Sequence, residues 1–366
     1  VYSPCDICEE KGQTTPLCQI KAFRVIHNKQ EKRIIYEDAF MEFFGVPVLY
    51  VPYFSHPDPT VKRQSGFLPP TIASSSELGQ EVEVPYFWAI SPDKDMTLIP
   101  RFTTKEGPVY QGEYRQRFES GRMEAFATGT WPRTRQTATP GDTDFRGSLF
   151  GDGEFDIDEY WKWSFRTELA TDDTYLRKYD LSSATDLINN INATYVNGRN
   201  SFTADAYYFR GLLTTDSEST TPWVAPVLQY EYAYPDQILG GNIGLSANAM
   251  ILGRNDGPQS RRVSSTVRWD KRETSTSGFV YRLFGSLRGD IYSVEDVPNT
   301  AVPGNDFEPQ TIARALPTIG TEWSYPLARS DGGVHQVIEP IVQLIYSPNV
   351  GNTVEIPDED SLSFEF

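Results

Sequence analysis

The chain has 366 residues, which is long enough for two domains and a large core. Its 33 basic and 50 acidic residues give a net charge of −17, which argues against a nucleic-acid partner because phosphate binding needs clustered lysine and arginine. The sequence has no run of about 18 apolar residues, so we expect no transmembrane helix. That absence does not exclude a membrane barrel, whose strands alternate apolar and polar residues.

Residues 1–44 contain all three cysteines and two predicted strands, Phe23–His27 and Arg33–Phe44. The polar residues 28–32 between them predict a turn. On the second strand four side chains share one face: Tyr36, Asp38, Phe40 and Glu42. The alternation is imperfect, which fits an open sandwich with a partly lined interior.

The stretch Gly45–Pro70 is dense in proline. We expect a short strand, Val46–Val51, that ends at Pro52. Proline removes a hydrogen-bond donor and fixes φ, so a run this dense is not expected inside a sheet. The stretch is therefore interpreted as a stiff connector between two domains.

From about residue 80 the strand pattern becomes regular, with alternation over 228–234, 243–251, 263–269 and 279–291. In the last of these, Tyr281, Leu283 and Leu287 make the apolar face, and Arg282, Ser286, Arg288 and Asp290 make the polar face. A soluble sandwich gives the same alternation. The ionised polar face favours a membrane barrel with a water-filled lumen.

Two further features favour the barrel. Aromatic residues stand near strand ends: Trp161, Trp163, Tyr207, Tyr208, Tyr232 and Tyr234. Connections alternate between tight turns, such as 119–121, and the long polar loops 214–222, 254–260 and 295–309. We expect about 11–14 strands in residues 80–366. Residues 361–366 look like the start of an unpaired strand, so we expect the natural protein to continue past Phe366.

Three separated motifs resemble the family of LPS-assembly outer-membrane proteins called LptD, OstA or Imp. The first runs from Pro47-Val48-Leu49-Tyr50-Val51-Pro52-Tyr53 to Lys62-Arg63-Gln64-Ser65-Gly66-Phe67-Leu68-Pro69, the second is Val84-Pro85-Tyr86-Phe87-Trp88-Ala89-Ile90-Ser91-Pro92, and the third is Ile338-Glu339-Pro340 with Gln343 and Tyr346. The resemblance implies an all-β fold. Residues 1–75 would be the end of a periplasmic β-jelly-roll with its Pro-rich join, and residues 76–366 the first part of a large antiparallel transmembrane β-barrel. A jelly-roll needs about eight strands, so the first domain is incomplete in this chain.

The resemblance also implies a function, the transport of lipopolysaccharide and its insertion into the outer membrane through sideways opening of the barrel. It places a lateral gate at Pro85 and Pro100, although proline also commonly ends strands. The candidates for the lipid groove are Tyr36, Phe40, Val48 and Tyr50. The implied partners are lipopolysaccharide, a plug lipoprotein in the lumen and a periplasmic jelly-roll protein that bridges to the barrel.

The cysteines have three interpretations. Cys5, Cys8 and Cys18 with His27 are too loosely spaced for a typical zinc site, and Cys5-x-x-Cys8 lacks the strand–helix setting of a redox motif. A disulfide is favoured because an exported protein lies in an oxidising compartment. The resemblance implies that Cys5 bonds a cysteine beyond this chain, and Cys8 is an available local partner. The pairing is open.

No catalytic motif is found, so we expect no enzyme, cofactor or metal. The chain has three histidines, none spaced to share a metal with another, and neither G-x-S-x-G nor H-E-x-x-H occurs. The acidic runs 152–159 and 358–360 lack the spacing of a calcium loop. The alternative functions are a porin-like diffusion channel, an outer-membrane lipid hydrolase and a soluble adhesin.

Overall fold

The computed structural model describes residues 18–43, 46–132, 145–298, 307–349 and 355–356. Over these residues the chain is nearly all antiparallel β-strand, as expected, with a single four-residue helix. The chain divides into two compact units, the first made of Val1–Pro69 and Pro85–Thr97 and the second of Pro70–Val84 and Leu98–Phe366.

The first unit contains a three-stranded antiparallel sheet in the order β1-β2-β3. Its strands are β1 (Cys18–Asn28), β2 (Arg33–Phe43) and β3 (Val46–Pro57). The turn between β1 and β2 forms because the Asn28 side-chain oxygen accepts the amides of Gln30 and Glu31, both at 3.1 Å. The same unit holds two short paired strands, β4 (Gly66–Phe67) and β7 (Tyr86–Ser91).

The prediction that the strand ends at Pro52 is wrong, because β3 continues to Pro57. β3 pairs only with β2 among the described residues, so it is an edge strand, where proline is tolerated. A register shift near Met41 places Pro47 opposite Glu42, and Pro52 lies between the registered pairs Glu37–Tyr53 and Ala39–Val51. Because an edge strand has a partner on one side only, a proline there can direct its missing donor away from that partner.

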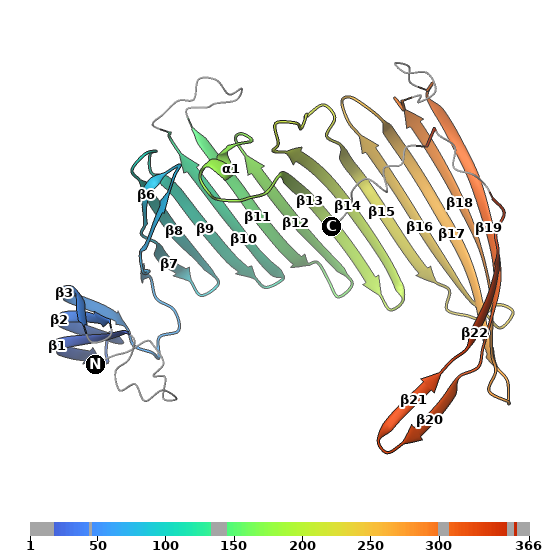
Figure 1. Cartoon of the computed structure of the whole chain (residues 1–366), viewed down its shortest axis with the longest axis horizontal. Coiled ribbons are helices and arrows are strands. Elements are labelled where there is room, and N and C mark those ends of the chain that lie inside the picture. Colours follow the sequence, from blue (N-terminus) through green and yellow to red (C-terminus); the bar gives the residue numbers. More distant parts are fainter. Residues whose placement is uncertain (1–17, 44–45, 133–144, 299–306, 350–354, 357–366) are drawn as a thin grey trace. The chain divides into compact units, whose positions relative to one another are not determined.

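The second unit is dominated by one continuous antiparallel sheet (Figure 1). Its long strands are β8 (Lys94–Thr103), β9 (Val109–Phe118), β10 (Gly121–Thr130), β11 (Arg146–Asp156), β12 (Trp161–Ala170), β13 (Asp186–Asn197), β14 (Asn200–Gly211), β15 (Trp223–Ala233), β16 (Asn242–Gly253), β17 (Gln259–Thr274), β18 (Val280–Glu295) and β19 (Gln310–Ser324), followed by β22 (Ile341–Tyr346). Two hairpins accompany them: β5 (Thr71–Ser75) with β6 (Gly79–Glu83), and β20 (Leu327–Asp331) with β21 (Val334–Ile338).

The expected alternation of connections holds in part. Between β9 and β10 the chain turns within two residues, whereas residues 212–222 and 296–309 form long links after β14 and β18. The link after β16, residues 254–258, is short, and the link between β15 and β16, residues 234–241, is longer than a tight turn. The described part of residues 80–366 holds sixteen whole strands, β7 to β22, which is more than the expected 11–14. The excess comes from the short strands β7, β20 and β21. In the part of the chain that the structure describes, no helix has the length and apolar character needed to cross a membrane.

The two faces of this sheet differ in chemistry. One face exposes apolar side chains that are about half exposed or more: Val263, Val267, Leu283, Leu287, Ile291 and Ile319. The opposite face of the same strands carries arginines, carboxylates and amides joined by hydrogen bonds. The predicted faces of residues 281–290 are therefore confirmed.

Aromatic rings cluster on the strands that meet at the tight turns. Phe155 stacks on Trp163 with ring centres 4.8 Å apart, and it also contacts Phe118. Phe165 lies so close to Gly153 that a Cβ there would come within 2.5 Å of the ring, so a larger residue would require the ring to shift. Rings that cover glycine shield the backbone on the face that exposes apolar side chains.

Candidate functional site

The two predicted gate prolines occupy different backbone settings. Pro100 lies inside β8, and Pro85 lies between β6 and β7 rather than in a strand. Each carbonyl accepts a backbone hydrogen bond: the Val84 amide donates to Pro100 at 3.2 Å, and the Leu68 amide donates to Pro85 at 2.9 Å. Since proline has no amide hydrogen, each residue accepts without donating.

The polar face of β15–β19 carries a ladder of charged pairs, within one strand, between neighbouring strands and, for Arg268 and Glu231, across the intervening β16. Arg268 bonds Glu231 at 3.0 Å, and Arg282 bonds Asp270 at 2.5 Å. Further along, Asp290 accepts from Arg288 at 2.8 Å and from Arg314 at 2.7 Å. Asp290 is 1% exposed, so two guanidinium groups offset the cost of burying its charge.

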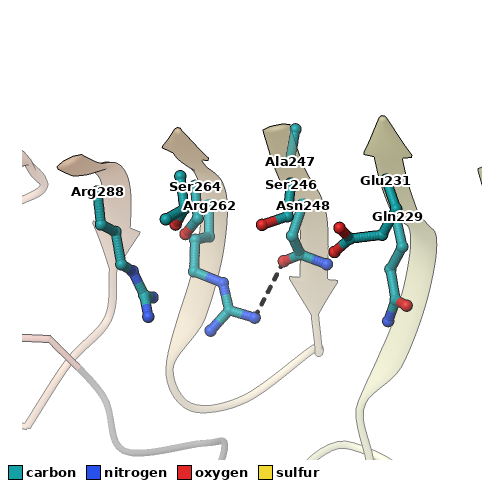
Figure 2. A pocket seen from close by; sticks show the side chains of 9 residues that line it. Gln229, Glu231, Ser246, Ala247, Asn248, Arg262, Ser264 and Arg288 are labelled. Atoms are coloured by element: carbon teal, nitrogen blue, oxygen red, sulfur yellow. Dashed lines mark hydrogen bonds between the residues drawn. The ribbon is translucent and has the colours of Figure 1, made fainter. Parts of the chain in front are cut away.

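This face is hollowed into two adjoining polar pockets. The first encloses about 290 Å³ and is lined by Gln229, Glu231, Ser246, Ala247, Asn248, Arg262, Ser264, Thr266 and Arg288. Figure 2 shows Arg262 pointing toward Asn248, whose side-chain oxygen accepts from it at 3.2 Å, with Glu231 on a neighbouring strand. The second pocket, of about 390 Å³, includes Glu231, Arg268 and Arg282.

The donors in these pockets are suited to polar ligands. Guanidinium groups bind phosphate and carboxylate, and amides and hydroxyls bind sugar hydroxyls. The lining contains neither cysteine nor histidine, so it offers no metal-ligand set of that kind. Across the described residues there is no group of three or more His, Cys, Asp or Glu side chains that could hold a metal ion.

The groove candidates of the first unit occupy different environments. Tyr36 is 3% exposed, and its hydroxyl bonds the His56 ring at 3.0 Å. Phe40 and Tyr50 are exposed and lie against each other with ring centres 5.0 Å apart. Val48 is also exposed. The structure thus brings Phe40 and Tyr50 together on the surface and places Tyr36 in the sheet interior.

Asp58 directly follows β3, and its side chain bonds to residues at that end of the sheet. Its carboxylate accepts the Thr60 hydroxyl at 2.7 Å and the Thr60 amide at 2.8 Å, and it also pairs with His27. These bonds, those of Thr60 first, lower the pKa of Asp58 to about 2. The predicted disulfide residues Cys5 and Cys8 lie outside the described residues.

Sequence reasoning missed the best-buried charged pair of the second unit. Arg146 begins β11 and donates two hydrogen bonds to Asp172, at 2.8 and 2.6 Å, and both residues are less than 10% exposed. Arg101 was missed as well, although it directly follows Pro100. Its guanidinium donates to the carbonyl of Tyr179, which is 78 residues away along the chain. Strand alternation carries no signal for such a contact.

Long antiparallel strands with one exposed apolar face and one charged face define an all-β protein of the type found in outer membranes. The family described as LptD, LPS transport system D, matches residues 144–366, which is more than half of the chain. The chain belongs to this family.

Its relatives carry a consistent name. A protein of Nitrosococcus oceani named LPS-assembly protein LptD is 26% identical over 95% of this chain and 46% of its own length. A protein of the same name from Methylococcus capsulatus is 30% identical over 64% of this chain and 22% of its own length. Another, from Idiomarina loihiensis, is 43% identical over 29% of this chain and 14% of its own length. The chain therefore spans less than half the length of these relatives.

Proposed function

We propose that this chain is part of an outer-membrane protein that delivers lipopolysaccharide to the outer leaflet. The observation that carries the proposal is the two-faced sheet, with exposed Leu283 and Leu287 on one side and the Arg–Asp ladder on the other. Membership of the LptD family and the name of the relatives, LPS-assembly protein, support the same function.

The chemistry of both faces fits such a cargo. Lipopolysaccharide joins acyl chains to a charged sugar head, so its carrier must offer an apolar path and a polar path at the same time. The apolar face is suited to contact with acyl chains of the bilayer. Arg262 and Arg268, in the pockets of the polar face, are suited to anionic groups of the head.

The same proposal covers domains, partners and location. Residues 1–75 would be the end of a periplasmic jelly-roll, with Tyr36, Phe40, Val48 and Tyr50 near its lipid groove, and residues 76–366 the first part of the barrel. A plug lipoprotein would occupy the polar side of the sheet, and a periplasmic jelly-roll protein would hand over the lipid. Cys5 would hold the two domains together through a disulfide. No catalytic step is part of this function.

The gate would lie where proline weakens backbone pairing. We call the backbone around Pro85 and Pro100 the seam. Each proline removes one amide donor, and one hydrogen bond is worth about 0.5–1.5 kcal/mol net. Two missing donors, one between β6 and β7 and one inside β8, would make the seam easier to open than a fully bonded strand pair.

The test is the double substitution Pro85→Ala with Pro100→Ala in the full-length protein. Restored donors should tighten the seam, so lipopolysaccharide delivery should slow and cells should admit large hydrophobic antibiotics, while the barrel assembles at its normal level. Pro317→Ala is the matched control, because Pro317 lies inside β19 opposite Leu287, on a strand pair far along the chain from the seam. Unchanged delivery and unchanged antibiotic sensitivity at normal protein level would remove the seam from the mechanism.

A further inference from the structure

The connection between β12 and β13, residues 171–185, folds into a buried cluster instead of extending as a polar loop. It contains the helix α1 (Tyr175–Lys178), which lies beside β11 (Figure 1). Tyr175, Leu176 and Tyr179 are at most 1% exposed. They share a hydrophobic cluster with Leu78, Val109, Ala170, Leu187 and Leu212. The segment therefore packs against residues that range from Leu78, in the turn between β5 and β6, to Leu212, directly after β14.

One side of this segment is fixed to β10 and β11. The Arg146 guanidinium holds Asp172 and lies over the rings of Tyr175 and Tyr179, 5.6 Å from each ring centre. Burial alone would raise the pKa of Asp172, but the hydrogen bonds and charge of Arg146, together with the hydrogen bonds from Thr174, outweigh it and lower the pKa. The hydroxyls of Tyr175 and Thr128 are hydrogen-bonded at 2.8 Å. This side forms a rigid support.

The other side reaches the strands of the seam. Arg101 donates from Nη1 to the Tyr179 carbonyl at 2.7 Å and from Nε to Glu83 at 2.7 Å. On the chain, Arg101 follows Pro100 and Glu83 precedes Val84, whose amide bonds Pro100. Close by, Lys178 pairs with Glu106 in the β8–β9 connection at 3.2 Å, and both side chains are largely buried.

The hydrogen bonds of the Arg101 side chain therefore lie next to Pro100, which has no backbone amide donor. β6 and β8 pair over only three registered positions, Glu81–Thr103, Val82–Phe102 and Glu83–Arg101. Arg101 spans this short ladder and at the same time joins it to the buried segment. Separating β6 from β8 would break the Arg101–Glu83 pair, and shifting β8 would break its contact with Tyr179.

We propose that residues 171–185 are a latch that holds β6 and β8 together at the seam, with Arg101 as its positioning residue. Release of the latch, through loss of the Arg101–Tyr179 and Lys178–Glu106 contacts, would precede opening. The role of the latch in transport rests on the proposed function, whereas its effect on the β6–β8 pairing does not.

The experiment measures hydrogen exchange of backbone amides in the full-length protein, in its complex as isolated from the outer membrane. Lys178→Met removes a largely buried charged hydrogen bond, and losses of this kind shift an opening equilibrium by about tenfold or more. We expect the amides of residues 81–84 and 101–103 to exchange about tenfold faster, with β17 and β18 unchanged. Arg177→Met is the matched control, because Arg177 neighbours Lys178 on α1 and is exposed.

Glu106→Gln is the second variant, since it keeps the size of the side chain and removes only its charge. If Lys178→Met fails to assemble, hydrogen exchange is measured in Glu106→Gln instead. Assembly is judged by whether heating changes the migration of the protein on a gel. Equal exchange at residues 81–84 in the parent, in Glu106→Gln and in Arg177→Met would overturn the latch. Faster exchange with unchanged lipopolysaccharide delivery would support the latch and contradict the seam as the route of the lipid.

Discussion

Leu287 and Asp290 lie three residues apart on β18 and face opposite sides of the sheet. Leu287 is 56% exposed, whereas Asp290 is 1% exposed between two arginines. In water, an exposed Leu287 would add nothing to the stability of the fold, and a run of exposed apolar residues would promote aggregation. The exposure of Leu287 is explained if lipid surrounds that face of the sheet.

A pair of matched substitutions tests this assignment. Leu287→Arg places a charge in the middle of β18 on the apolar face and should destabilise the folded protein in bilayers by about 2–4 kcal/mol. Ser286→Arg places the same side chain one residue away on the polar face, where a solvated charge should cost at most about 1 kcal/mol. Unfolding by denaturant from lipid vesicles measures both values. Similar costs at the two positions would mean that the apolar face does not meet lipid.

At the scale of single elements, the sequence predicts the strands of the large sheet well. Alternation identifies β16–β18 and the faces of their side chains because each strand has one apolar and one polar side. It fails for β3, because whether Pro52 breaks a strand depends on its edge position and on the register shift near Met41, and both are properties of the sheet.

The α1 segment could not be found from alternation either. Residues 171–174 are polar and read as an ordinary loop, and the helix that follows has only four residues. Its stability comes from Arg146 in β11, Leu78 in the turn between β5 and β6, and Arg101 in β8. Contacts over such sequence distances depend on how the strands are arranged in space, which the alternation of residues does not encode. For the same reason, the sequence identified the gate prolines and missed the residue that follows one of them.

The three-stranded sheet should depend on pH through Asp58. Its pKa is lowered from 3.8 to about 2, mainly by Thr60, so ionised Asp58 stabilises the fold fully above about pH 4. That contribution is lost as the pH falls from about 4 to about 2. Asp58→Asn should therefore speed hydrogen exchange in β1–β3 at pH 6, after correction for intrinsic rates, and the difference from the parent should shrink toward pH 2.

The control is Glu31→Gln, which removes an exposed carboxylate from the turn between β1 and β2. It should leave exchange in β1–β3 close to that of the parent at each pH. A difference between Asp58→Asn and the parent that stays constant from pH 6 to pH 2 would show that the Asp58 charge does not stabilise the sheet.

At the scale of the whole second unit, aromatic residues mark both ends of the long strands. Trp223 begins β15 after a long loop, and Trp323 lies next to the last residue of β19, at the end with the turns; both are more than 40% exposed. Tryptophan favours the boundary between lipid and water. A tryptophan at each end, with the exposed Leu287 between them, matches the polarity profile of a bilayer better than that of a soluble sandwich.

Depth-dependent quenching of tryptophan fluorescence tests this arrangement in the full-length protein reconstituted in vesicles. The emission lost in Trp223→Phe or Trp323→Phe isolates each residue. Lipids brominated near the head group should quench both residues more strongly than lipids brominated near the chain ends, because both are expected at the boundary. Leu287→Trp should show the reverse order, since it lies in the middle of the apolar face. If all three positions respond alike to shallow and deep bromine, the sheet does not span the bilayer along its strands.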